Sequence, residues 1–370
     1  MRALHIITGL GIGGAEQQLR LLLRHLPATC DVVTLTDPGP VAEGLAADGV
    51  RVVHLGMSGN RDLAALPRLV KVIRAGRYDL VHTHLYRACV YGRLAARLAG
   101  VRAVVATEHS LGDSQMEGRR LGPGVRALYL ATERLGRTTV AVSPTVAGRL
   151  RRWGVPAPRI EIVPNGVDVA RFRFDPDLRE HTRRRLGLPE DAYVIGGVGR
   201  LAPGKRFDVL IRALAELPGD CRLLLVGGGR QESALRRAAH DAGVADRVLF
   251  AGERPSGGAP GADLPSLTGA MDVLASPSPE EAFGLAVVEA LAAGLPVLYV
   301  SCPAVEDLPD GAAGGATRVE GGADSFVRAL TAVRAAGPAP RSAPEAAHHY
   351  CITRSAARLM DVYAAAVSRT

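Results

Sequence analysis

Short apolar runs with little polar alternation recur along the first half of the chain, separated by longer stretches of helical periodicity. A strand without alternation is buried on both faces, which is typical of a parallel sheet covered by helices. The pattern predicts helices at Ala15–Leu26 and Ala88–Leu98 and strands at Ala3–Thr8, Val32–Thr36, Val50–Leu55, Leu80–Thr83, Ala103–Thr107 and Thr139–Val142.

The same alternation begins again near Tyr193. The pattern there predicts, after a strand that opens at Tyr193, helices at Phe207–Leu217, Gln231–Ala242 and Gly284–Ala293 and strands at Arg222–Val226, Val248–Ala251, Val273–Ala275 and Pro296–Val300. We therefore expect two Rossmann-like, doubly wound α/β domains, at residues 1–168 and 169–345, that face each other across a cleft. The boundary is expected within the polar segment 163–177, and a C-terminal helix at 346–370 is expected to pack back on the first domain.

Composition favours a large globular protein in a reducing compartment. The chain has 370 residues, of which 47% are hydrophobic, enough for two domains with real cores. Its five cysteines lie far apart and include no C-x-x-C pair, so we expect reduced thiols and a cytoplasmic location. The N-terminal apolar run continues into a glycine loop, which favours a first strand over a signal peptide. The apolar segment 282–305 contains Glu289, Gly294, Pro296 and Pro303, which favour a buried helix and strand over a membrane span.

Positive charge is concentrated in the first half of the chain. Residues 1–170 contain 22 Lys and Arg against 13 Asp and Glu, and residues 171–370 contain 23 against 24; the resulting +9 and −1 sum to the net charge of +8. The basic half is either an ordinary solvated surface or a surface for an anionic partner, such as a membrane or a phosphate-bearing acceptor. Only Lys71 and Lys205 are lysines, so Arg is the usual cation here.

A glycine loop, GLGIGG, separates the first predicted strand from the first predicted helix. Gly9, Gly11 and Gly14 fit a loose G-x-G-x-x-G pattern, and Asp37 lies where a dinucleotide-binding site would place an acid. The loop could bring backbone N–H groups and a helix N-terminus close to an anion. A dehydrogenase site and a tight turn without a ligand both remain alternatives at this point.

Two further segments of the second domain carry polar residues suited to a nucleotide sugar. Arg200 follows a strand and Lys205 precedes a helix, so both cations could hold a diphosphate beside a helix N-terminus. In SPEEAFGLAVVE, Glu281 precedes a helix, Glu289 lies on it, and the first-turn N–H groups fall between these two acids. Carboxylates accept hydrogen bonds from sugar diols, and free N–H groups bind phosphate or sugar oxygens.

These motifs together resemble the retaining glycosyltransferases of family 4, which have the two-domain GT-B fold. The resemblance covers nearly the whole chain and rests on Gly13-Gly14-Ala15-Glu16, Glu108-His109-Ser110, Ser143, Pro164-Asn165-Gly166-Val167-Asp168, Gly199-Arg200-Leu201 with Lys205, Val226-Gly227-Gly228-Gly229, and the E-x7-E segment from Glu281 to Glu289. It implies transfer of a hexosyl group from a nucleotide diphosphate sugar to an acceptor hydroxyl, with retention of the anomeric configuration.

The resemblance also implies roles for individual residues. The implied donor-binding set comprises Arg200 and Lys205 at the diphosphate, Glu289 at the ribose diol, the backbone of Phe283, Gly284 and Leu285 at the sugar, and Gly13 and Gly14 near the phosphate. His109 and Glu281 are the expected catalytic residues, beside the transferred sugar. No metal or cofactor is expected, and the D-x-D at Asp175 and Asp177 lies in the interdomain linker. Two loops, 252–266 and 299–306, depart from the family pattern and leave the base and one side of the sugar site open.

The acceptor and the enzyme class have open alternatives. The basic first half would suit a lipid-linked or envelope glycan at an anionic membrane, and no nucleic-acid partner is expected. Asp113 and Glu117, with Glu108 nearby, would suit a small cationic acceptor such as an aminocyclitol antibiotic precursor. Another sugar or sugar phosphate is the third option. A nucleotide-sugar 2-epimerase of the same fold, an NAD(P)-dependent dehydrogenase and a binder without activity are the rival functions.

Overall fold

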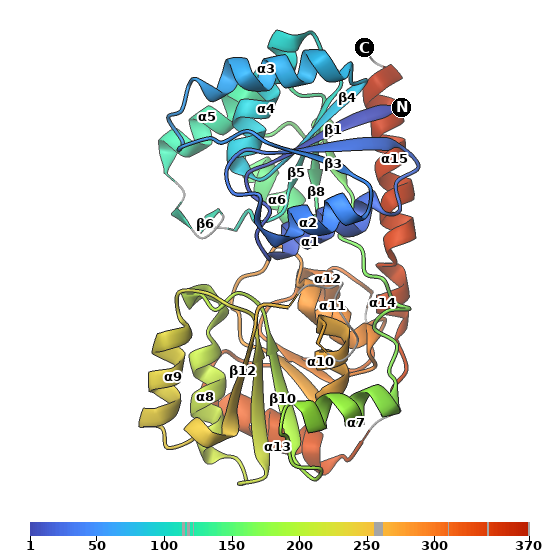
Figure 1. Ribbon diagram of the computed structural model, residues 1–370. Helices are drawn as coiled ribbons and strands as arrows, with labels where there is room; N and C mark the ends of the chain where they lie inside the picture. The colour runs from blue at the N-terminus through green and yellow to red at the C-terminus, as the bar shows by residue number, and fades with distance from the viewer. Residues whose placement is uncertain are drawn as a thin grey trace. The chain divides into compact units, whose positions relative to one another are not determined.

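The computed structural model describes residues 1–112, 115–116, 119–120, 122–254, 262–309, 311–338 and 340–368. The chain divides into two compact units, each built on a parallel sheet covered by helices (Figure 1). Unit 1 comprises Met1–Gly166 and Ile352–Thr370, and unit 2 comprises Val167–Cys351. Both units thus have the doubly wound architecture that was predicted from apolar runs with little polar alternation.

The sheet of unit 1 has seven parallel strands in the order β3-β2-β1-β4-β5-β8-β9. Chain order reverses between β1 and β4, where ligands bind in open α/β sheets. The bounds are β1 Arg2–Ile7, β2 Thr29–Thr34, β3 Arg51–His54, β4 Leu80–His84, β5 Val104–Glu108, β8 Thr138–Ala141 and β9 Ile160–Ile162. A two-stranded antiparallel ribbon, β6 Gln115–Met116 and β7 Arg119–Arg120, follows β5.

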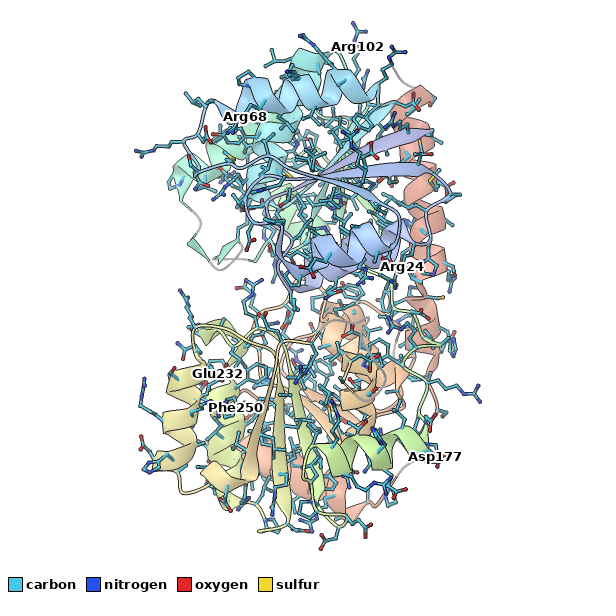
Figure 2. All side chains as sticks on the ribbon, in the orientation of Figure 1. Arg24, Arg68, Arg102, Asp177, Glu232 and Phe250 are labelled. Atoms are coloured by element: carbon cyan, nitrogen blue, oxygen red, sulfur yellow. The ribbon has the colours of Figure 1, made fainter. Side chains whose placement is uncertain are left out.

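Helices cover both faces of this sheet. One apolar cluster packs α1, α2 and α15 against it, and a second cluster packs α3 and α4. The helices of unit 1 are α1 Gly14–Leu23, α2 Gly39–Ala47, α3 Ala65–Gly76, α4 Tyr86–Ala99, α5 Pro123–Glu133, α6 Pro144–Trp153, the 3-10 turn η1 Ala157–Arg159 and α15 Ile352–Ser368. Charged side chains such as Arg24, directly after α1, and Arg68 on α3 are exposed at the surface of the unit (Figure 2).

The sheet of unit 2 has six parallel strands in the order β12-β11-β10-β13-β14-β15, again with a reversal, here between β10 and β13. The strands are β10 Tyr193–Val198, β11 Cys221–Val226, β12 Val248–Gly252, β13 Val273–Ser276, β14 Val297–Tyr299 and β15 Ala316–Arg318. The helical elements are α7 Pro176–Arg185, η2 Pro203–Lys205, α8 Phe207–Glu216, α9 Glu232–Asp241, η3 Ala245–Arg247, α10 Leu264–Ala270, α11 Leu285–Ala292, α12 Pro303–Glu306, α13 Ala323–Ala335 and α14 Glu345–His349. Apolar residues of α8, α9 and α13 form one core against this sheet.

The C-terminal segment forms two helices, one in each unit. The shorter helix, α14, belongs to unit 2, where Tyr350 stacks edge-on against Phe283. The longer helix, α15, belongs to unit 1 and buries Leu359 and Tyr363 in the core beside β4 and β5. Gly166 allows the close approach at this end of unit 1, because a Cβ there would lie 2.5 Å from the Ile352 Cα. The chain therefore returns to its first unit after completing the second.

Among the described helices, none is both long enough and apolar enough to cross a membrane. The apolar segment around Glu289 forms α11 and β14, and Val287, Val288, Leu291, Val297 and Leu298 of these elements are buried in unit 2. The expectation that this segment is a buried helix and strand is confirmed.

Candidate functional site

The predicted donor residues gather at the strand-order reversal of unit 2. Arg200 and Lys205 lie in the connection after β10, and Glu281 lies in the connection after β13, the strand paired with β10. Because the carboxyl ends of adjacent parallel strands meet at one edge of a sheet, residues separated by about 80 positions in sequence come together. The order of the strands in the sheet therefore brings the residues of this site together.

Close backbone packing between two glycine turns positions Arg200. The Gly199 N–H donates to the Val226 carbonyl at 2.9 Å, and the Leu201 N–H donates to the Gly228 carbonyl at 2.8 Å. Gly227 has φ +138°, and a Cβ there would lie 2.0 Å from the Gly199 carbonyl oxygen. The Gly227–Gly229 turn must therefore lack side chains for the Arg200 loop to take this path. The side chain of Arg200 is exposed.

Lys205 and Glu281 form an ion pair that links the two loops. Their side chains are 32% and 15% exposed, so the pair is reachable by solvent but not fully hydrated. The Ser278 hydroxyl bonds to two carbonyls, of Gly204 at 3.2 Å and of Glu280 at 3.0 Å, and so joins the same loops. The structure thus brings together a predicted phosphate ligand and a predicted sugar ligand.

Gly284 sets the start of α11. It is the N-cap with φ +96°, a left-handed conformation, and a Cβ there would lie 2.4 Å from the Cys302 Sγ. The helix begins at Leu285, one residue later than predicted, so its first-turn donors are shifted by one residue. The Phe283 side chain is 3% exposed and packs on Tyr350. Only the backbone of Phe283 is therefore available for the predicted contact.

Glu289 is a buried carboxyl group on α11. The residue is 9% exposed, and among the described residues the structure shows no hydrogen-bond or ion-pair partner for its side chain. Burial raises the pKa of Glu289 to about 8. A carboxyl group in this setting is a candidate ligand for hydroxyl groups.

The predicted phosphate loop of unit 1 leads into α1. Gly13 is the N-cap and Gly14 the first helical residue, so the first-turn N–H groups have no carbonyl within the helix. A Cβ on Gly14 would meet nothing within 4 Å, so packing does not require glycine there. From the next turn, the Gln18 side chain donates to the Gly166 carbonyl at 2.6 Å and accepts from its N–H at 2.8 Å. This reciprocal pair fixes α1 against the end of unit 1.

His109 belongs to a buried histidine cluster that the sequence analysis missed. The His109 Nε2 lies 3.0 Å from the His84 Nδ1, and the His84 Nε2 lies 3.1 Å from the His5 Nδ1. His82 pairs through its two ring nitrogens with Tyr363 at 2.6 Å and with Thr107 at 2.7 Å. A usable signal was present, because His5 and His82 fall within strands predicted to be buried on both faces, and His84 follows the second of these strands directly.

Burial lowers the pKa of these histidines. The pKa falls to about 3 for His5 and to about 4 for His109, and it falls well below the ordinary value for His82 and His84. The imidazole rings are therefore neutral at neutral pH. His5, His82 and His84 also lie close enough to one another to be a candidate set of metal ligands.

A cavity of about 30 Å³ adjoins the exposed end of this cluster, large enough for one water molecule or one hydroxyl group. Polar and apolar side chains line it, among them His84, Thr107 and His109 from the strand ends and Gln18, Asn165 and Ser355 around them. The Nδ1 atom of His109 is buried and has no hydrogen-bond partner among the described residues.

Other predicted features have structural roles or lie outside the described residues. Glu108 is 2% exposed and lies 3.6 Å from the Cys89 thiol, so it does not face a surface acceptor. Asp175 caps α7 by accepting from the N–H groups of Asp177 and Leu178. Asp113, Glu117 and residues 255–261 of the loop expected near the base lie outside the described residues.

Two family models match the chain in series. Residues 12–171 match Glycosyltransferase Family 4, and residues 179–347 match Glycosyl transferases group 1. The D-inositol 3-phosphate glycosyltransferase of Salinispora tropica is 33% identical over 374 residues, covering 90% of this chain and 76% of that protein. The 2-deoxystreptamine glucosyltransferase of Streptomyces kanamyceticus is 33% identical over 246 residues, covering 63% of this chain and 62% of that protein.

Solved structures share the fold. The Anabaena protein HepE in complex with UDP and glucose matches with a TM-score of 0.84 at 22% identity, covering 99% of this chain and 100% of that chain. The UDP-GlcNAc 2-epimerase from Methanocaldococcus jannaschii matches with a TM-score of 0.65 at 12% identity, covering 99% and 100%. Fold similarity alone therefore does not separate a transferase from an epimerase, but the sequence matches do. The chain belongs to glycosyltransferase family 4 and has the GT-B fold.

Proposed function

We propose that the protein transfers a hexosyl group from a nucleotide diphosphate sugar to a hydroxyl group of a cyclitol, with retention of the anomeric configuration. The donor-binding part of this proposal rests on one observation. At the strand-order reversal of unit 2 lie Arg200, Lys205, Glu281 and Glu289. Such a site offers cations to phosphates and carboxylates to sugar hydroxyls, in the order in which a nucleotide sugar presents these groups.

In the proposed reaction, the bond between the anomeric carbon and the diphosphate oxygen breaks as the bond to the acceptor oxygen forms on the same face. The leaving diphosphate oxygen takes the acceptor's proton, so no protein nucleophile is required. Negative charge grows on the diphosphate, and Arg200 and Lys205 would stabilise it electrostatically. These cations would supply the charge neutralisation in the proposed metal-free mechanism.

The remaining predicted residues would hold the sugar and the ribose. The carboxylate of Glu281, once released from Lys205, would accept hydrogen bonds from sugar hydroxyls, and Glu289 would accept from the ribose diol. The backbone at Phe283, Gly284 and Leu285 would bind sugar oxygens. For unit 1, the proposed roles of His109 and of the Gly13–Gly14 loop are contacts with the substrate.

The relatives favour a cyclitol acceptor. One relative is named for inositol 3-phosphate and another for 2-deoxystreptamine. Both compounds are polyhydroxylated six-membered carbon rings. This narrows the small-molecule alternative of the sequence analysis. The excess positive charge of residues 1–170 would suit the phosphorylated compound better than the cationic one.

Two experiments test the proposal in sequence. A thermal-shift screen with UDP, GDP, ADP and TDP, their common sugars and NAD(P) should identify one sugar nucleotide that stabilises the protein most. That donor is then incubated with D-inositol 3-phosphate, with 2-deoxystreptamine, and without an acceptor. A glycoside whose anomeric coupling constant matches that of the donor would support retaining transfer. Stabilisation by NAD(P) alone, or epimerisation of the sugar nucleotide without an acceptor, would refute it.

A peripheral contact with an anionic membrane is a separate proposal, carried by α3. This helix exposes Lys71 and Arg74 beside a shallow hollow lined by Leu66, Val70 and the 55%-exposed Leu98. Cations around an apolar hollow suit the headgroups and upper acyl chains of an anionic bilayer. Such a contact would bring the enzyme to a lipid-linked acceptor.

A further inference from the structure

Six side chains of unit 1, five of them buried and the sixth, His109, half-buried, form one continuous chain of hydrogen bonds. Its order is Thr107, His82, Tyr363, His5, His84 and His109. Four of the five contacts measure between 2.6 and 3.1 Å, and the contact between the Tyr363 hydroxyl and the His5 Nε2 measures 3.4 Å. The two terminal residues, Thr107 and His109, line the same small cavity.

The histidine tautomers in this chain are coupled. A neutral imidazole carries one N–H, so each ring donates through one nitrogen and accepts through the other. If the His5 Nδ1 donates, the His84 Nε2 must accept, and His84 must then donate from Nδ1 to the Nε2 of His109. Reversing any one ring would place two N–H groups or two lone pairs face to face. The three rings therefore share one tautomer.

Two directions of donation follow from this coupling, and they present opposite chemistry to the cavity. When donation runs toward His109, its Nδ1 carries the proton and becomes a buried donor. When donation runs toward Tyr363, the same Nδ1 is a buried acceptor. In neither direction does this atom have a partner among the described residues. Buried polar atoms are satisfied in most proteins, so a partner is expected in the cavity.

We propose that the cavity beside His109 binds one hydroxyl group, either of a water molecule or of a polyol substrate, and that His5, His84 and His109 reverse their tautomers together to meet it as donor or acceptor. A hydroxyl group suits this position because it both donates and accepts. It also fits the volume, which is about that of one water molecule. This assignment concerns unit 1 alone and does not depend on the proposed glycosyl transfer.

The hydrogen bonds favour this interpretation over a metal site. His5, His82 and His84 lie close together, but both ring nitrogens of each already have a partner. A metal ion bound to all three would have to break at least two of these contacts, because each histidine would give up one ring nitrogen and only His5 and His84 share a contact. The tautomer-coupled chain uses every ring nitrogen of the three histidines as it stands.

The test uses the full-length protein labelled with ¹⁵N-histidine, because nitrogen chemical shifts distinguish the two neutral tautomers. In the unmodified protein, His5, His84 and His109 should show the same tautomer. In Tyr363→Phe, the His5 Nε2 loses its partner. A bare lone pair is less costly there than an unpaired N–H, so all three rings should adopt the Nδ1–H form. Tyr350→Phe, a buried tyrosine of unit 2, is the control and should change none of them.

Mixed tautomers among the three rings, in either protein, would overturn the proposal, and so would a protonated imidazolium at neutral pH. The unmodified protein alone supplies this test if Tyr363→Phe does not fold. Addition of myo-inositol then distinguishes the two sources of the hydroxyl group. A changed His109 Nδ1 shift would assign the site to a polyol, and an unchanged shift together with a water cross-peak would assign it to water. Absence of both would refute occupation of the cavity.

Discussion

Lys205 donates to the carboxylate of Glu281 across the boundary between two loops that follow adjacent strands of unit 2. The proposed roles of these residues are different, since one would hold the diphosphate and the other the sugar. In the ligand-free protein each therefore satisfies the other. A bound diphosphate would attract Lys205 and leave Glu281 to accept from sugar hydroxyls, so binding of the two parts of the donor would be coupled.

Replacing Lys205 with Ala should weaken binding of the sugar nucleotide about 10- to 100-fold, because a charge-assisted hydrogen bond to phosphate is lost. Lys71→Ala is the matched control, since Lys71 is the other lysine of the chain and is exposed on α3. Isothermal titration calorimetry, with the donor identified by thermal shift, measures the affinity of each variant for the donor. Equal affinities for the two variants would remove Lys205 from the donor site.

Glu289 should make donor binding depend on pH. In the free protein its pKa is raised to about 8 by burial, so the carboxyl group is mostly neutral at pH 7. A ribose diol that donates hydrogen bonds favours the ionised form, and binding should therefore release a proton. Affinity should rise with pH by at most about tenfold per unit up to pH 8, and then level off.

Calorimetry in buffers of different ionisation enthalpy counts the released protons. A sugar nucleotide is the right ligand for this measurement, because it lacks the terminal phosphate whose own titration would confuse the result. Glu289→Gln should bind more weakly and lose the proton release. An affinity that is flat between pH 6 and pH 8, with no proton released, would contradict the proposed contact with the diol.

The same carboxyl group should reduce stability as pH rises. Its folded-state pKa of about 8 lies above the ordinary glutamate value of 4.5, so between these pH values the folded protein holds a proton that the unfolded chain has released. Stability is therefore lost between about pH 4.5 and pH 8. Glu289→Gln, which carries no charge, should be the more stable protein at pH 8 by on the order of 4 kcal/mol.

Thermal unfolding at several pH values measures this difference. The gap between Glu289→Gln and the unmodified protein should widen from pH 5 to pH 8 and stay constant above that. Glu190→Gln, at an exposed position of unit 2, is the control and should show no such trend. A constant gap across the range would mean that Glu289 is hydrated or paired in solution. Together with the binding result, a widening gap would indicate a residue kept for function at a cost in stability.

Sequence reasoning predicted the sheets because the strands are buried on both faces. The predicted strand Leu80–Thr83 corresponds to β4 Leu80–His84, and Val273–Ala275 corresponds to β13 Val273–Ser276. The edge strand β9 was not predicted, since it has three residues and one of them, Glu161, is exposed. Short edge strands carry little hydrophobic pattern, and their pairing is decided by their neighbours.

The candidate donor residues were predicted from motifs, but their mutual contacts were not. Nothing in the sequence indicates that Lys205 and Glu281 pair, because their contact depends on how two loops fold. The histidine chain was missed for the same reason. Its members lie on β1, β4, β5 and α15 and, for His109, directly after β5, and the distance from His5 to Tyr363 along the chain conceals the contact.

The basic face of α3 predicts binding to anionic vesicles. Lys71 and Arg74 are exposed beside the apolar hollow, so replacing both with Glu should abolish most binding by repelling the lipid phosphates. The control variant replaces Arg236 and Arg237 of α9 with Glu, which changes the net charge by the same amount and leaves α3 intact. Co-sedimentation with vesicles of phosphatidylglycerol and phosphatidylcholine should show binding at low salt that decreases as salt is added. Equal loss in both double variants would reduce the effect to net charge, and no binding at low salt would favour a soluble acceptor.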